Sequence, residues 1–219
     1  MDLLIFDLDG TLIDSKLDLA HAVNATRGHL GMPPLEHERV YSYVGNGAPV
    51  LIRRVLGPDA TEAQVEESLE FFLEYYRDHK LDYTVLYPGV RQALDRLRDA
   101  RVQMAVLTNK PVGPAKAICD GLGLSPYFFS IYGGDSFPTK KPDPLGLHTL
   151  MTESGATPEE TVMIGDSDVD MLTARNAGTW SMACTFGLAP ESLEEVTPDA
   201  FADHASAWAL ALGGAEIEA

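Results

Sequence analysis

The chain has 219 residues, enough for one large domain or for a domain that carries a second, inserted one. Its shares of hydrophobic (45%) and charged (22%) residues are typical of a soluble globular protein, and no segment has the roughly 18 apolar residues that cross a membrane. The formal net charge of −17 argues against nucleic acid or anionic membranes as partners, because its field repels phosphates. We therefore expect a cytoplasmic protein.

Five short apolar runs bounded by turn residues are predicted to be strands buried on both faces. In chain order they are LLIFDLD, VQMAVLTN, FFSIYGGD, TVMIGD and WSMACTFG. Helices are predicted between the later runs, over residues 112–122, 145–154 and 168–176, because each follows a proline or ends near a glycine. This alternation predicts an α/β fold, a doubly wound parallel sheet with helices on both faces.

About eighty residues separate the first two predicted strands, although a parallel crossover needs only about a dozen. Helical spacing extends over SKLDLAHAVNATRGHL, VGNGAPVLIRRVLG and TEAQVEESLEFFLEYYRDH, the last with Thr61 as a capping residue. We predict a helical cap domain at residues 15–85, inserted into a core of residues 1–14 and 86–219. The Pro-Gly pair of YPGV, at residues 87–90, is a natural hinge and is followed by a predicted helix.

Polar residues follow the predicted strands, at the sheet edge where ligands bind in open parallel sheets. They are Asp7 and Asp9 after the first strand, Thr108 and Asn109 after the second, Asp135 after the third, and Asp166, Asp168 and Asp170 after the fourth. Asp7 and Asp9 are two apart, so in a regular strand their carboxylates lie on one side and repel. A hard divalent cation would resolve this repulsion, and Mg²⁺ suits a site with few carboxylates and room for a phosphate.

Each of these features has a plainer explanation when it is taken alone. DLDGT is typical of an Asp-Gly turn, and GDSDVD of a helix N-terminus. Thr108 alone would be a strand-end hydroxyl, and Lys141 a solvated loop charge. Cys119 and Cys184 lie in apolar contexts without a nearby ligand pair, which predicts a structural role for both. It is the occurrence of four polar segments at one sheet edge that indicates a shared site.

Together these segments resemble the four motifs of the haloacid dehalogenase-like phosphohydrolases. The matching segments are DLDGT with Asp7 and Asp9, LTN with Thr108, KKPDP with Lys141, and GDSDVD with Asp166 and Asp170. The resemblance covers the whole chain, because this family also carries a helical cap after its first motif. Within the family, VGNGAPVLIRRVLG and LTNKP are most similar to the phosphoglycolate phosphatase branch.

The resemblance implies a phosphatase that acts on a small phosphate monoester, with 2-phosphoglycolate as the first candidate. It implies that Asp7 is the nucleophile, which forms an aspartyl-phosphate, and that Asp9 is the general acid and then the general base. It also implies that Mg²⁺ is held by Asp7, the backbone carbonyl of Asp9 and Asp166, with Asp170 acting directly or through water. Asp168 is expected only to cap a helix.

The resemblance further implies that Thr108 and Lys141 hold phosphoryl oxygens, and we include the adjacent Asn109 among the substrate-binding residues. Lys141 would also offset the charge on Asp7. It is preferred to Lys140 because it directly precedes the proline of its motif, as in the family pattern. Lys140 is expected to be solvated.

In the cap, Gly45, Asn46 and Gly47 are predicted to form a loop at a helix N-terminus that faces the site and favours an anion. Arg53 is our candidate for a contact with a substrate carboxylate, with Arg54 as the alternative, although arginines on a helix surface are usually solvated. We expect the cap to close over the substrate and to exclude water from the first step.

Other functions stay open at this point. A phosphatase of the same superfamily could act on a sugar phosphate, a nucleotide or pyrophosphate, and a receiver-like signalling module has similar polar strand ends but no long helical insertion. A dehalogenase does not require Asp9, a hexose-phosphate mutase would have a cap-hinge histidine at Leu19, and an inactive scaffold usually loses a motif. A phosphonate hydrolase would need a cap lysine, for which Lys16 remains a candidate. Both a monomer and a homodimer are compatible with the sequence.

Overall fold

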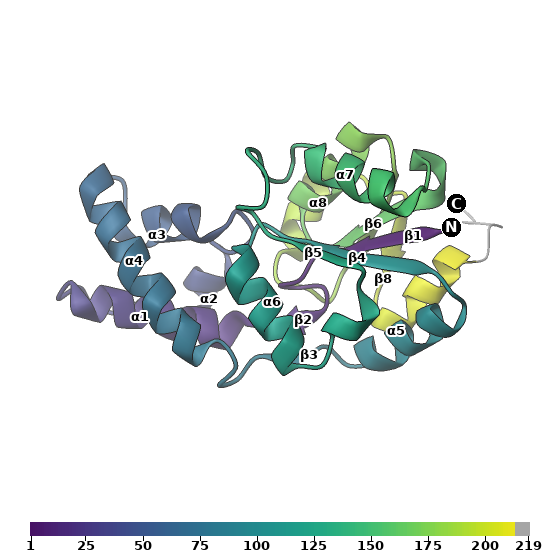
Figure 1. The fold of residues 1–219 in the computed structure, drawn as a ribbon. Coiled ribbons are helices and arrows are strands. Elements are labelled where there is room, and N and C mark those ends of the chain that lie inside the picture. Colours follow the sequence, from purple (N-terminus) through teal and green to yellow (C-terminus); the bar gives the residue numbers. More distant parts are fainter. Residues whose placement is uncertain (213–219) are drawn as a thin grey trace.

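A computed structural model describes residues 1–212 of the chain. Six parallel strands form one sheet in the order β5-β4-β1-β6-β7-β8 (Figure 1). These strands are β1 (Leu3–Phe6), β4 (Gln103–Leu107), β5 (Ser130–Tyr132), β6 (Thr161–Gly165), β7 (Trp180–Cys184) and β8 (Ala200–Ala202). The predicted parallel α/β sheet is confirmed.

Helices cover both faces of this sheet, as the residues of β1 illustrate. The helices are α5 (Val90–Asp99), α6 (Val112–Gly121), α7 (Leu145–Ser154) and α8 (Asp168–Ala177). Leu4 and Phe6 belong to the hydrophobic cluster that includes residues of α5 and α6, whereas Leu3 and Ile5 belong to the cluster with α7 and α8. The alternation of side chains along a strand therefore feeds two separate cores.

Four helices lie beside the sheet and form the left part of Figure 1. They are α1 (Lys16–His29), α2 (His37–Tyr41), α3 (Ala48–Leu56) and α4 (Glu62–His79). Helix α4 begins with a capping box, in which Thr61 and Gln64 each accept a backbone N–H of the other. The chain enters this group after β2 (Ile13–Asp14) and leaves it before β3 (Val85–Leu86), two short strands that pair antiparallel. The exact domain boundaries stay a prediction.

The structure contains three strands that were not predicted from the sequence, and a fourth strand is more exposed than predicted. Strand β5 was expected to be buried on both faces, but it is half-buried because it lies at the sheet edge and pairs with β4. Strands β2, β3 and β8 were not predicted. Each has only two or three residues, too few for a hydrophobic pattern to be visible.

The last described element is a 3-10 helix, η4 (Ala205–Leu212), which packs against α5. Trp208 is fully buried, and its ring centre lies 5.0 Å from that of Phe6. Its Nε1 donates a hydrogen bond to Sγ of Cys184 at 3.4 Å. Cys119 and Cys184 are both free and buried, as predicted for structural cysteines. Within residues 1–212, none of the helices combines the length and apolar character that a membrane crossing requires.

Candidate active site

Three buried carboxylates meet at the carboxyl ends of β1 and β6. Asp7 directly follows β1, Asp166 directly follows β6, and Asp170 lies in the first turn of α8. One oxygen from each of these residues lies within 4.8 Å of the others. Asp166 is held by the backbone N–H groups of Leu188 and Ala189, at 2.7 and 3.3 Å. The structure thus brings together the three carboxylates that the sequence analysis selected as metal ligands.

The turn after β1 allows this close approach because its central residue is glycine. Gly10 has a φ of +86°, in the left-handed region that favours glycine. A Cβ atom at this position would lie 2.1 Å from Oδ2 of Asp166. The Asp-Gly step of the first motif therefore shapes the site as well as the turn.

Burial and mutual repulsion raise the pKa of two carboxylates in this cluster, Asp7 and Asp166. Burial raises the pKa of Asp7 to about 6; Lys141 opposes this effect, and Asp170 adds to it. Burial, together with the charges of Asp170 and Asp7, holds the pKa of Asp166 well above its usual value. The protein's own groups thus leave negative charge at this point incompletely balanced, which favours a bound cation.

Lys141 is the cation of this cluster. Its Nζ lies 3.0 Å from Oδ1 of Asp7 and 2.5 Å from Oδ1 of Asp170. Burial alone would lower the pKa of Lys141, but the two carboxylates raise it above its usual value, so the side chain stays charged. The other oxygen of Asp170 accepts the N–H of Asp166 and both the N–H and the hydroxyl of Ser167. Asp170 therefore fixes both Lys141 and the loop after β6.

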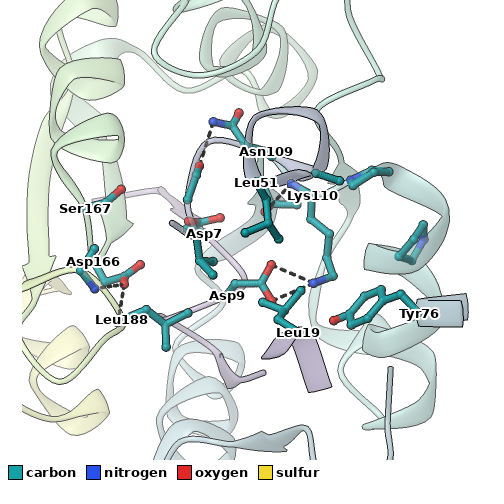
Figure 2. Close-up of a pocket in the computed structure, with 18 of the residues that line it drawn as sticks. Asp7, Asp9, Leu19, Leu51, Tyr76, Asn109, Lys110, Asp166, Ser167 and Leu188 are labelled. Atoms are coloured by element: carbon teal, nitrogen blue, oxygen red, sulfur yellow. Dashed lines mark hydrogen bonds and ion pairs between the residues drawn. The ribbon is translucent and has the colours of Figure 1, made fainter. Parts of the chain in front are cut away.

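Asp9 lies apart from the three carboxylates, in contrast to our expectation. Its side chain accepts hydrogen bonds from Nζ of Lys110 at 2.9 and 3.0 Å (Figure 2). It also accepts one from Oγ of Ser15 at 2.5 Å. Strand β1 ends at Phe6, so its alternation does not extend to Asp9. Each of the two carboxylates has a lysine partner, Lys141 for Asp7 and Lys110 for Asp9, so their mutual repulsion is already reduced by the protein's own groups. A metal contact from the backbone carbonyl of Asp9 stays a prediction.

Lys110 is a residue of the site that the sequence analysis missed. It lies in the loop after β4, is 7% exposed, and places its Nζ 4.7 Å from the ring centre of Tyr76 on α4. Burial alone would lower the pKa of Lys110, but Asp9 and then Tyr76 raise it above its usual value. Its position directly after Thr108 and Asn109, at the same strand end, was a signal that could have found it.

Thr108 and Asn109 lie at this sheet edge, as predicted, and both are buried. Oγ1 of Thr108 accepts the N–H of Lys110 at 3.2 Å. Nδ2 of Asn109 donates to the carbonyls of Gly45 and Lys141, at 3.2 and 3.1 Å. Its Oδ1 is buried and has no hydrogen-bond partner within the described part of the chain. Asn109 thereby connects the loop after β4 to two other loops of the site.

Three of the four helices, α1, α3 and α4, supply the opposite wall of a cavity over these residues (Figure 2). Apolar side chains dominate this wall, among them Leu19 of α1, Leu51 of α3 and Phe72 of α4. Gly45 and Gly47 line the cavity just before α3, where we predicted an anion-binding loop. The cavity therefore has a charged floor and a largely apolar roof.

Asn46 takes part in this loop through its backbone. Its carbonyl accepts a hydrogen bond from Nζ of Lys140 at 2.6 Å. Lys140 was expected to be only solvated; it is exposed, but it also links the loop before α3 to the loop that carries Lys141. Partial burial lowers the pKa of Lys140.

Other charged residues singled out from the sequence lie away from the cavity. Arg53 and Arg54 project from the face of α3 opposite its buried residues, and Arg53 forms an ion pair with Glu62 at 2.5 Å. Lys16 forms an ion pair with Asp14 at 3.1 Å. The structure does not bring Arg53, Arg54 or Lys16 to the site.

Asp135 and Asp168 stay outside the carboxylate cluster. Oδ1 of Asp135 accepts the N–H of Val112 at the start of α6, at 2.7 Å. Asp168 is the first residue of α8, where its negative charge suits the helix N-terminus, as expected. Asp135, from the loop after β5, thus satisfies a backbone N–H at the start of α6, and Asp168 belongs to the start of α8.

The motifs and their geometry agree with a comparison against protein families. The family described as "Haloacid dehalogenase-like hydrolase" matches residues 4–184, from β1 to the end of β7. The chain belongs to the haloacid dehalogenase-like hydrolases. The resemblance stated from the four motifs is thereby confirmed.

Known members of the family are similar to this chain over most of its length. A phosphoglycolate phosphatase of Chromobacterium violaceum is 43% identical over 192 residues, which are 85% of this chain and 86% of that protein. A phosphoglycolate phosphatase of Vibrio parahaemolyticus is 40% identical over 211 residues, 93% of this chain and 92% of that protein. The crystal structure of a predicted phosphoglycolate phosphatase from Haemophilus somnus has a TM-score of 0.89 at 30% identity and covers 95% of this chain and 96% of its own.

Proposed function

We propose that this protein is a Mg²⁺-dependent phosphatase that hydrolyses a small phosphate monoester, with 2-phosphoglycolate as its substrate. The observation that carries this proposal is the buried cluster of Asp7, Asp166 and Asp170, with Lys141 bound to Asp7. Asp7 and Asp166 of this cluster line a covered cavity. The names of the similar proteins from Chromobacterium violaceum and Vibrio parahaemolyticus support the choice of substrate. The cytoplasmic location and the state as a monomer or homodimer stay predictions.

The carboxylate cluster fits Mg²⁺ in both chemistry and charge. Carboxylate oxygens are the hard ligands that this ion prefers, and the raised pKa of Asp7 and Asp166 reflects negative charge that a cation would stabilise. Asp7 and Asp166 would hold the ion directly, with the backbone carbonyl of Asp9. Because both oxygens of Asp170 already accept hydrogen bonds, we propose that Asp170 acts through a water. The bound ion would supply positive charge against the phosphoryl oxygens.

Asp7 is the nucleophile in this proposal, and its hydrogen bonds leave one oxygen free. Oδ1 of Asp7 accepts the N–H of Leu8 at 2.7 Å and lies 3.0 Å from Nζ of Lys141. Oδ2 is therefore the oxygen that attacks phosphorus, forming an aspartyl-phosphate as the bond to the ester oxygen breaks. Water then hydrolyses the acyl phosphate and restores the carboxylate.

In this proposal, Asp9 acts on the leaving group and Thr108 binds the phosphoryl group that is transferred. Asp9 gives a proton to the ester oxygen as it leaves and later takes one from the attacking water. Oγ1 of Thr108 accepts the N–H of Lys110, so its hydroxyl hydrogen is available to a phosphoryl oxygen. The apolar roof from α1, α3 and α4 limits access of bulk water during the first step.

Initial rates with a panel of phosphate monoesters at fixed Mg²⁺ test this proposal. The panel contains 2-phosphoglycolate, a hexose phosphate and a nucleoside monophosphate, with pyrophosphate as a further comparison. We expect 2-phosphoglycolate to have the highest kcat/KM, and we expect excess chelator to abolish turnover. If 2-phosphoglycolate ranks among the slowest substrates, the proposed substrate is wrong but the proposed phosphatase activity is retained. If no monoester is hydrolysed, the proposed function fails.

A further inference from the structure

The cavity is lined by a lysine, Lys110, that is not part of the four family motifs. Among the described residues that line the cavity, Lys110 is the one lysine or arginine. Lys141 is not part of this lining and is engaged by Asp7 and Asp170. Arg53, our candidate from the sequence for a contact with a substrate carboxylate, lies elsewhere and is paired with Glu62. A negatively charged group in the leaving part of a substrate would therefore meet Lys110 first.

The position of Lys110 relative to Asp9 defines which part of a substrate it can reach. Nζ of Lys110 lies 2.9 and 3.0 Å from the two carboxylate oxygens of Asp9. In the proposed reaction Asp9 serves the ester oxygen, so this oxygen would lie within hydrogen-bond reach of Asp9. In 2-phosphoglycolate a single methylene joins the ester oxygen to the carboxylate. That carboxylate can thus reach Lys110 while the ester oxygen stays at Asp9.

A second buried donor lies at the same place. Tyr76 of α4 is 2% exposed and lines the cavity, and its hydroxyl has no hydrogen-bond partner among the residues that the structure describes. Its ring lies against Nζ of Lys110, and Figure 2 shows its hydroxyl on the side of Lys110 and Asp9. A lysine ammonium has three donors, of which Asp9 engages two in this structure. One ammonium N–H and one phenol O–H are therefore available to a ligand.

We propose that Lys110, assisted by the hydroxyl of Tyr76, binds the carboxylate of the substrate and makes this phosphatase selective for carboxylate-bearing phosphate monoesters. The proposal rests on the proposed function and identifies the residues that select its substrate. A neutral leaving group would leave a buried ammonium N–H and a buried hydroxyl unpaired, which costs binding free energy. Lys110 lies on the sheet side and Tyr76 on α4, so the carboxylate would also join the two walls of the cavity.

Steady-state kinetics with two matched substrates test this role. The substrates are 2-phosphoglycolate and its neutral amide, 2-phosphoglycolamide, which differ only in the charged group. We expect Lys110→Gln to lower kcat/KM for 2-phosphoglycolate by about 100-fold or more, as for the loss of one partner from a buried charge pair. For the amide the same variant should lose less than about tenfold. Lys110→Arg keeps the charge and should retain more of the preference for the carboxylate than Lys110→Gln.

Equal losses on both substrates in Lys110→Gln would overturn the proposal, because they would mean that Lys110 serves only as the counterion of Asp9. A wild-type protein that hydrolyses both substrates equally well would also overturn it while leaving the phosphatase function intact. If the wild type hydrolyses neither substrate but cleaves other phosphate monoesters, the proposed substrate and this inference both fail.

Binding to a variant without the nucleophile gives a readout that does not depend on turnover. In an Asp7→Asn background with Mg²⁺, calorimetry compares 2-phosphoglycolate with inorganic phosphate. Adding Lys110→Gln should weaken the binding of 2-phosphoglycolate much more than the binding of inorganic phosphate. Tyr76→Phe should also weaken the binding of 2-phosphoglycolate, by a smaller factor. Equal effects on the two ligands would contradict the proposal. Circular dichroism of each variant verifies that it is folded.

Discussion

The two aspartates of the first motif have different partners, and these partners fit the different chemical roles that we propose for them. Asp7 lies 3.0 Å from Lys141 within the carboxylate cluster, whereas both oxygens of Asp9 accept hydrogen bonds from Lys110. Asp7 therefore has an oriented carboxylate with one free oxygen, as a nucleophile requires. Asp9 faces the cavity, where a leaving group would be.

The raised pKa of Asp7 predicts how pH affects the stability of the metal-free protein. An unfolded aspartate loses its proton near pH 3.9, whereas folded Asp7 keeps it until about pH 6 because of burial. The folded state thus binds more protons across this window, so the free energy of unfolding falls as pH rises from about 4 to about 6. Urea unfolding in chelator at pH 5 and pH 7.5 measures this contribution, and Mg²⁺ should restore stability at pH 7.5.

Other groups titrate in the same range, so Asp7→Asn is the necessary control. Asparagine is uncharged at both pH values and resembles the protonated aspartate. We expect the metal-free variant to be more stable than the wild type at pH 7.5, with a much smaller difference at pH 5. A stability difference that does not depend on pH would show that Asp7 keeps an ordinary pKa without metal.

At the scale of elements, the turn after β1 is predicted to be the part least tolerant of change. Gly10→Ala introduces a Cβ atom 2.1 Å from Oδ2 of Asp166 and a side chain at a φ of +86°. The backbone conformation alone costs on the order of 1–3 kcal/mol, and displacement of Asp166 should also remove most activity. Chemical unfolding and the rate of phosphate release measure the two effects.

Gly31→Ala is the matched control for this prediction. Gly31 also has a positive φ, of +68°, but no other atom lies within 4 Å of its hypothetical Cβ. We expect this variant to lose stability through the backbone alone and to keep its activity. If Gly10→Ala and Gly31→Ala had the same activity, close packing of the turn against Asp166 would not matter for function.

The elements also show what the sequence could predict and where it could not. Strands β1 and β6 and helix α4 were predicted because continuous apolar runs and a capping pattern extend over several residues of each. The carboxylate cluster followed from strand order, because the ends of parallel strands share one edge. The contact between Lys110 and Tyr76 was not predictable in this way. It joins the end of β4 to α4, one of the four helices beside the sheet.

Helix phase explains why Arg53 was selected and yet lies outside the site. The sequence analysis placed the start of α3 at the cavity and offered Arg53, with Arg54 as the alternative, as a candidate for a contact with the substrate. The buried residues of α3 are Ala48, Leu51, Ile52 and Val55, which fixes the inner face of this helix. Arg53 falls on the outer face, at the distance along the helix that we expected but in the wrong direction.

At the scale of the whole molecule, η4 completes the core far along the sequence from β1. Trp208 packs on Phe6 and belongs to the cluster that covers one face of the sheet. We expect Trp208→Ala to lower the free energy of unfolding by about 3–5 kcal/mol, the usual cost of removing a buried aromatic side chain. Trp208→Phe should cost less, because it keeps the ring contact and loses the hydrogen bond to Cys184. Urea unfolding of both variants tests this order.

In the proposed reaction, Asp7 carries the phosphoryl group during hydrolysis. The most direct measurement mixes the protein with 2-phosphoglycolate and Mg²⁺, quenches the reaction in acid within the first turnover, and maps phosphorylated peptides by mass spectrometry. We predict a phosphoryl group on the peptide that contains Asp7, and none there in Asp7→Asn. Hydrolysis without any phosphoenzyme under these conditions, or a phosphoryl group on another residue, would contradict the account.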